Sequence, residues 1–436
     1  MTIARPPSLV PATAAAQPSA PRARPRLVEL ARVSLWLGLT GFGGGLSVLS
    51  LIRNELVVKR PWLTEREFAN TVTISQMLPG GASANVLAYA GLRFHKLRGA
   101  LVGYLGFVLP GFVAVLALAF AYVRYGATPN AELVLSGFNS AVVGLIIAVA
   151  LKMAATSIAR LWQMAIAAAA LLLSFVGNAA PAEVVLLGIA GGFIVDLNDR
   201  RRVAARRAVR RPKPAVGLPE EGRLLDRAVK PSVDQKDKTR LQAPALVTMA
   251  AALLGVAILH SHLAELLRAY FAFFRTGLGA YGGGFAIIPH LKTVMHQTGW
   301  LTDQQFADAV AIGKLTPGPV LLLATFIGYV KDGLIGGVLA TIAIFAGPFG
   351  LIVLFGTWLN RVRSRRWVRV ALRGLTPAVV GLMAAAAIAL GTGFSSNAEI
   401  GIAAACALTL ARFEVNPVLM LALGGAARIG LKAFGV

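Results

Sequence analysis

The chain has 436 residues, of which 56% are hydrophobic and only 14% are charged, whereas soluble domains carry about 25% charged residues. The apolar residues form long blocks between short polar stretches. These blocks exclude an ordinary soluble globule, and they also exclude a membrane β-barrel, whose strands would alternate apolar and polar residues. The single cysteine, Cys406, excludes disulfides and cysteine-based metal sites. The sequence therefore predicts an all-α polytopic membrane protein.

Basic residues gather in a few connectors and give the chain a formal net charge of +24. Residues 1–26 are rich in Pro, Ala, Ser and Arg, without an apolar core of signal-peptide length, which predicts a disordered cytoplasmic leader. From Asp199 to Ala243, fourteen Lys or Arg face six acids, and no aromatic residue is present that could stack on a base. A solvated cytoplasmic loop facing anionic lipid explains this stretch better than a nucleic-acid partner.

The apolar segments define the expected organisation of the chain. Six precede the basic stretch, at residues 30–52, 68–92, 99–123, 133–155, 160–177 and 181–197. Seven follow it, at residues 244–262, 264–290, 306–330, 334–359, 372–392, 396–411 and 415–434. We thus expect a leader (1–26), a first transporter repeat (27–197), a basic cytoplasmic linker (198–243), a connecting transmembrane helix (244–262) and a second repeat (263–436).

An internal repeat at an offset of about 238 residues supports this division. The matched motifs are Gly43-Gly44-Gly45 with Gly282-Gly283-Gly284, Trp62-Leu63-Thr64 with Trp300-Leu301-Thr302, Pro79-Gly80 with Pro317-Gly318, Pro110 with Pro348, and Ala141–Leu145 with Ala378–Leu382. Segment 244–262 makes the number of crossings between equivalent positions odd, so the repeats should be inverted in the membrane. Charge agrees, because six arginines crowd residues 361–373 while the equivalent connector, 124–136, carries only Arg124.

The first two segments of the first repeat allow two topologies. The leader and the connectors 53–67 and 93–98 are all basic, so all three could be cytoplasmic. Segments 30–52 and 68–92 would then be re-entrant hairpins folded at their Gly-rich and Pro-Gly centres. Alternatively both segments span the membrane, and acids offset the charge of an external 53–67 loop. The sequence leaves both open.

Broken segments in inverted repeats are typical of secondary transporters, in which half-helix N-termini present unpaired N–H groups to anionic ligands. A small anion is therefore the expected cargo. The Gly runs at 43–45 and 282–284 would let backbone approach such a ligand, although Gly in membrane helices also serves helix packing. Pro79-Gly80 and Pro317-Gly318-Pro319 point more strongly to breaks, because such runs do not continue a regular helix.

Lys314 is the clearest ionisable candidate inside an apolar segment. It precedes the Pro317 break, where the first repeat has Gln76, and could neutralise part of an anion's charge, with Asp308 as a resting partner. The alternative is that Lys314 snorkels to an interface. A membrane-embedded enzyme is the rival from another class, but it needs a buried nucleophile and base or a metal cluster, and the sequence contains no such motif.

At this point the motifs resemble those of the chromate ion transporters in their long form with two homologous halves. The resemblance rests on Gly-Phe-Gly-Gly-Gly at 41–45, Trp62-Leu63-Thr64, Gln76-Met77-Leu78-Pro79-Gly80, Leu109-Pro110, the stretch Tyr281–Pro289, and Leu315-Thr316-Pro317-Gly318-Pro319. It implies export of chromate, with sulfate as a mimic, across the bacterial cytoplasmic (inner) membrane. Another small anion is the alternative cargo. No cofactor or metal is expected, and a homodimer is left open.

Three departures from the family pattern concern the substrate more than the fold. Gly81 and Gly45 stand where many members have Pro, and Leu323 stands where an Asn is common, although its counterpart in the first half is Asn85. The expected substrate-binding residues are Gly43, Gly44, Gly45, Gln76, Pro79, Gly80, Asn85, Gly282, Gly283, Gly284, Lys314, Thr316, Pro317 and Gly318.

Overall fold

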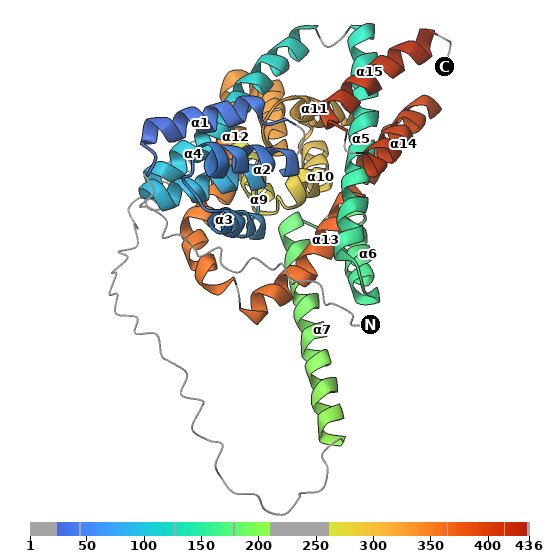
Figure 1. Cartoon of the computed structure of the whole chain (residues 1–436). Coiled ribbons are helices and arrows are strands. Elements are labelled where there is room, and N and C mark those ends of the chain that lie inside the picture. The colour runs from blue at the N-terminus through green and yellow to red at the C-terminus, as the bar shows by residue number, and fades with distance from the viewer. Residues whose placement is uncertain are drawn as a thin grey trace, which may run out of the picture.

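The computed structural model describes residues 24–42, 45–125, 128–177, 179–209, 261–363, 365–413 and 415–433, and every regular element within them is a helix (Figure 1). Five of these helices are long and apolar enough to cross a membrane. The prediction of an all-α polytopic membrane protein is therefore confirmed. Most of the predicted leader and linker, and almost all of segment 244–262, lie outside the described residues.

The two halves present their helices in the same order. The first half comprises α1 (Leu27–Thr40), α2 (Gly45–Arg53), the π-helix η1 (Asn54–Lys59), α3 (Glu65–Met77), α4 (Ala82–Tyr125), α5 (Pro129–Ser157), α6 (Leu161–Phe175) and α7 (Pro181–Val209). The second comprises α9 (Ser261–Leu278), the 3₁₀-helix η2 (Gly282–Ile287), α10 (Ile288–Thr298), α11 (Asp303–Leu315), the 3₁₀-helix η3 (Val320–Leu322), α12 (Leu323–Val362), α13 (Arg366–Gly391), α14 (Asn397–Arg412) and α15 (Pro417–Ala433). Helix α7 extends into the predicted linker.

The repeated Trp-Leu-Thr motif marks a helix start. The Thr64 hydroxyl accepts a hydrogen bond from the Glu67 backbone N–H at 2.9 Å, and the Glu67 carboxylate accepts one from the Thr64 N–H at 2.9 Å. Thr302 and Gln305 form the same reciprocal cap at the start of α11. Because such a cap satisfies N–H groups that a helix end leaves unpaired, this motif serves local folding.

Both of the longest helices contain a sharp reversal. In α4 the backbone leaves helical geometry at His95 and Lys96, and in α12 it does so at Asp332 and Gly333. A Cβ on Gly91 would clash with the Gly99 carbonyl oxygen, so the two arms of α4 lie against each other. The predicted connector 93–98 is thus a tight turn.

The first two segments of the first repeat are helical hairpins, the form that the re-entrant alternative predicts. Across the second hairpin, the Asn85 amide donates to the Ser75 carbonyl at 3.3 Å, and Arg93 pairs with Glu67 at 2.7 Å, so the arms run antiparallel. Across the first, the Lys59 ammonium lies over the Trp36 ring at 5.3 Å. Each arm of about 20 Å is too short to cross about 30 Å of hydrocarbon. Both segments are therefore re-entrant in form.

The two halves are inverted. The second arms of α4 and α12 are equivalent, and they pack antiparallel, because Tyr104 contacts Phe349 with ring centroids 5.1 Å apart while Leu116, further along α4, lies beside Gly337, earlier in α12. The halves also exchange partners: α5 packs on α14 and α15, and α13 packs on α6 and α7. Figure 1 shows α7 and α15 at opposite ends of the molecule.

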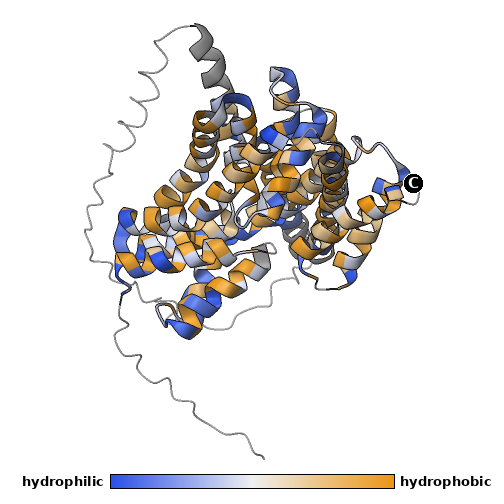
Figure 2. Cartoon of the chain, turned by 90° about the horizontal axis from the view of Figure 1, so that it is seen from above, coloured by the Kyte–Doolittle hydropathy of each residue, from blue (hydrophilic) through white to orange (hydrophobic). Residues whose placement is uncertain are grey.

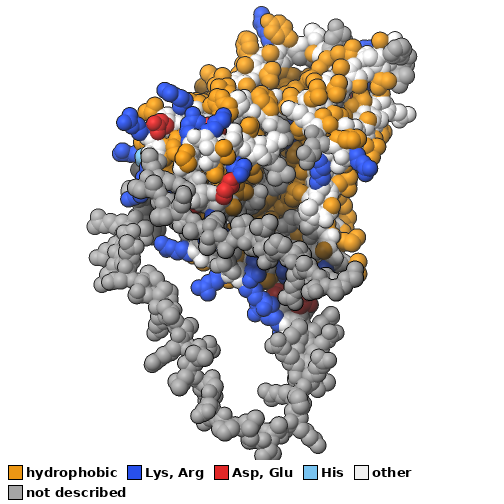
Figure 3. Space-filling model, viewed as in Figure 1, with side chains coloured by type: hydrophobic (Ala, Val, Ile, Leu, Met, Phe, Trp, Pro, Cys, Tyr) orange, Lys and Arg blue, Asp and Glu red, His pale blue; other side chains and the backbone are white. Residues whose placement is uncertain are grey.

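The surface fits a membrane protein. Hydrophobic residues predominate along the helices, and hydrophilic residues concentrate at helix ends (Figure 2). Figure 3 shows most of the Lys and Arg side chains of one face on its left and lower parts, and a few at its right edge and top, where hydrophobic side chains predominate. A concentration of basic residues toward one side is what the positive-inside rule predicts for a chain whose basic connectors share a side.

Candidate functional site

The tips of the four hairpins meet at the centre of the molecule. The Gly80 N–H donates to the Ala280 carbonyl oxygen at 2.7 Å, and the Gly318 N–H donates to the Gly41 carbonyl oxygen at 3.5 Å. These bonds are equivalent under the repeat, so each Pro-Gly tip is tied to the Gly-rich segment of the opposite half. The two tips also touch, because a Cβ on Gly81 would lie 2.9 Å from the Cβ of Pro319. The predicted breaks thus converge on one place.

Both Pro-Gly tips adopt the same backbone turn. Gly80 has φ +109° and Gly318 has φ +111°, a conformation that side-chain-bearing residues rarely adopt. In the first tip, the buried Asn85 amide donates to the Pro79 carbonyl at 2.9 Å and so secures the turn. In the second, Leu323 replaces Asn85, and Pro319 restricts the backbone instead. This accounts for an Asn in the half that lacks the second proline.

The membrane-spanning arms make room for the tips. A Cβ on Gly111 would clash with the Pro317 carbonyl oxygen, and a Cβ on Gly80 would lie 2.7 Å from the Cβ of Pro348. Gly111 was not among the predicted site residues. The neighbouring Pro110 matches Pro348 in the internal repeat, and this match was the sequence signal that could have indicated Gly111.

The second Gly run forms an irregular turn at the same junction. Gly282, Gly283 and Gly284 have φ values of +63°, +74° and +92°. A Cβ on Gly284 would lie 3.0 Å from Val320, whereas one on Gly283 would meet nothing within 4 Å. In the first run, Gly43 and Gly44 lie outside the described residues, and Gly45 begins α2.

Lys314 lies in the last turn of α11, just before the second tip. Its ammonium sits 4.0 Å from the centre of the Phe285 ring, and within the described residues it forms no ion pair. The expected pairing with Asp308 is wrong, because the carboxylate of buried Asp308 accepts hydrogen bonds from Tyr122, Asn139 and Gln304, at 2.9, 2.9 and 3.1 Å. Sequence reasoning missed Phe285, although it lies directly after the Gly run.

The two Pro-Gly hairpins differ in their packing. Helix α11 packs against α5 through the Asp308 hydrogen bonds, whereas the equivalent helices α3 and α13 make at most slight contact in the described part of the chain. Accordingly Lys314 is half-buried, while its counterpart Gln76 is exposed and does not pack in the junction. Thr316 is buried, and its hydroxyl donates to the Ile312 carbonyl at 3.3 Å.

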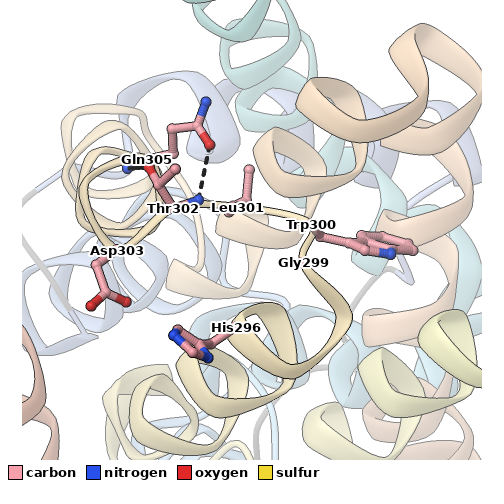
Figure 4. A pocket seen from close by; sticks show the side chains of 7 residues that line it. All are labelled: His296, Gly299, Trp300, Leu301, Thr302, Asp303 and Gln305. Atoms are coloured by element: carbon pink, nitrogen blue, oxygen red, sulfur yellow. Dashed lines mark hydrogen bonds between the residues drawn. The ribbon is translucent and has the colours of Figure 1, made fainter.

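Two surface hollows lie at the open ends of hairpins, away from the junction. One, of about 460 Å³, lies at the turn between α10 and α11 and is lined by His296, Gly299, Trp300, Leu301, Thr302, Asp303 and Gln305 (Figure 4). The other, of about 300 Å³, lies between α1 and η1. The hairpin tips themselves are packed together, so in this conformation the junction is closed.

Comparisons with known proteins agree with the motifs. The family model described as "Chromate transporter" matches residues 28–194 and 267–429. A "Chromate transport protein" of Cupriavidus metallidurans is 29% identical over 94% of this chain and 93% of its own length. A "Probable chromate transport protein" of Synechococcus elongatus is 30% identical over 84% of each chain. An uncharacterized transporter of Methanocaldococcus jannaschii is 24% identical over 92% of this chain and 94% of its own. No solved structure matches.

Proposed function

Because the chain belongs to the chromate transporter family, we propose that it exports chromate from the bacterial cytoplasm across the inner membrane, and that sulfate-like oxyanions compete for the same site. The relatives named as chromate transport proteins support this substrate. The observation that carries the proposal is the junction where each Pro-Gly tip bonds to the opposite Gly-rich segment.

The backbone N–H groups at such a junction favour an anion. Helix α4 starts at Ala82, directly after the first tip, and the first N–H groups of a helix have no partner within it. Together with the helix dipole they favour a negative ligand. Separating the tips by a small motion would expose these groups to an oxyanion.

Lys314 supplies the charge in this proposal. Eleven residues of α11 separate it from the base of its hairpin, a distance of about 17 Å at 1.5 Å per residue. A lysine at that depth cannot easily reach the interface at the hairpin base. The Phe285 ring stabilises the Lys314 ammonium until a bound dianion replaces the ring as its partner.

The membrane potential is sufficient to drive export. Moving one charge across 100 mV is worth about 2.3 kcal/mol, so a dianion leaving a negative cytoplasm gains about 4.6 kcal/mol. At about 1.4 kcal/mol per tenfold, this sustains a gradient on the order of a thousandfold. A uniporter therefore needs no coupling ion.

Counterflow tests the proposal. Proteoliposomes preloaded with unlabelled chromate should transiently accumulate labelled chromate from outside, and external sulfate should reduce that accumulation. Liposomes without protein serve as the control. If preloaded chromate drove no accumulation but another preloaded small anion did, that anion and not chromate would be the substrate.

A further inference from the structure

The hollow between α1 and η1 is a charged pocket outside the junction of the hairpin tips. It has a volume of about 300 Å³ and is lined by Arg32, Val33, Trp36, Glu55, Lys59 and Arg60. It lies at the open end of the first hairpin, away from the tips. Three cations and one acid give it a net charge of +2.

The π-helix η1 builds this pocket. Glu55 is buried, with its side chain only 5% exposed, and it pairs with Lys59 at 2.7 Å and also with Arg60. The wider turn of a π-helix places residues i+4 and i+5 on either side of residue i, so one carboxylate holds both cations. Their side chains remain 53% and 42% exposed, respectively, so each can contact a further ligand.

Arg32 supplies a further positive charge to the pocket. It is exposed on α1, and no ion pair joins it to an acid in the described part of the chain. It lies one turn from Trp36, whose ring carries the Lys59 ammonium on its face. A ligand entering the pocket would therefore meet Arg32 on one side and the Lys59–Arg60 pair on the other.

The pocket lies beside an exposed apolar stripe of α1. Val28, Leu35 and Leu39 are 69%, 37% and 58% exposed and lie on the same face of α1 as Arg32 and Trp36, at helical spacing. Exposed apolar side chains on a membrane protein face acyl chains, and Trp is enriched where hydrocarbon meets headgroups. The cations thus lie at headgroup level beside an apolar stripe.

The charge is specific to this half of the molecule. At the equivalent positions of the second repeat, Lys59 and Arg60 are replaced by Gln297 and Thr298. Because the repeats are inverted, these two neutral residues lie on the opposite side of the membrane. A general need of the fold would have kept the charges in both halves.

We propose that this pocket binds the phosphate of an anionic phospholipid headgroup, with Arg32, Lys59 and Arg60 as its ligands and the Leu35–Leu39 stripe along its acyl chain. The net charge of +2 selects an anionic over a zwitterionic lipid. The bound lipid would tie α1 to η1 and hold the open end of the first hairpin at the membrane surface.

Lipid-dependent stability of the purified full-length chain in nanodiscs tests this site. In phosphatidylcholine discs, adding phosphatidylglycerol should raise the unfolding temperature of the wild type. Arg32→Gln should need about fivefold more phosphatidylglycerol for the same rise, the value expected for one cation near an anionic surface. Lys59→Gln should act similarly, while Arg60 remains to pair with Glu55.

Arg66→Gln is the matched control, because Arg66 is exposed on the neighbouring α3 and does not line the pocket. It should titrate like the wild type. Equal phosphatidylglycerol dependence of Arg32→Gln and the wild type would overturn the proposal. So would an equal stabilisation of the wild type by inorganic phosphate in pure phosphatidylcholine discs, since the pocket would then bind a soluble anion.

Discussion

Replacing Lys314 by Gln, the residue that the first repeat carries at Gln76, removes the charge from the hairpin junction with little change in shape. The Lys314 ammonium lies 4.0 Å from the Phe285 ring centre and has no carboxylate partner in the described residues. Its charge is thus available to a dianion. A charge-assisted contact is worth about 1–3 kcal/mol, so chromate affinity should fall by about fivefold to 150-fold.

Initial rates of chromate uptake into proteoliposomes, normalised to inserted protein, measure this effect. Lys314→Arg should retain part of the activity, because the charge survives although the planar group fits differently. Lys292→Gln is the control, since Lys292 lies one helix away and its ammonium already binds the Ala389 carbonyl at 2.8 Å. Wild-type affinity in Lys314→Gln would remove this residue from the site.

Two further predictions concern the backbone. Lys96 is the one residue other than Gly with positive φ in the described chain, at φ +53° and ψ −141°, and its counterpart in the second half is Gly333 at +63° and −149°. Lys96→Gly should therefore raise the free energy of unfolding by about 1 kcal/mol, because the relief of backbone strain exceeds the cost of the added entropy of the unfolded chain. Chemical denaturation measures this change. A loss of stability would show that the turn is not strained. Gly80→Ala should abolish most transport, because the added Cβ would lie 2.7 Å from the Cβ of rigid Pro348. The Cβ added by Gly283→Ala would meet nothing within 4 Å, so this variant should cost only the backbone strain of about 1 kcal/mol. Equal transport activity of the two variants would contradict the tight packing of the tip.

Much of the architecture could be predicted because long apolar blocks and an internal repeat determine it. The breaks at Pro79-Gly80 and Pro317-Gly318 lie where the sequence placed them, since no regular helix continues through such runs. The inversion followed from the parity of the crossings and from charge bias. These features depend on local residue types and on counting.

Other features depend on contacts between distant segments and could not be predicted. The hydrogen bond from Gly80 to Ala280 joins residues 200 apart, and no local pattern indicates it. Asp308 was expected to pair with Lys314 on the same helix, but it binds Tyr122 and Asn139 from the other half. Three neutral donors supply the hydrogen bonds that this buried carboxylate needs.

Chromate uptake driven by an imposed membrane potential tests the central claim most directly. In proteoliposomes without a proton gradient, an inside-positive potassium diffusion potential should drive uptake that rises with the potential and that protein-free liposomes lack. Uptake that does not change with the potential, and that occurs only when a proton gradient is imposed, would contradict potential-driven transport of a dianion.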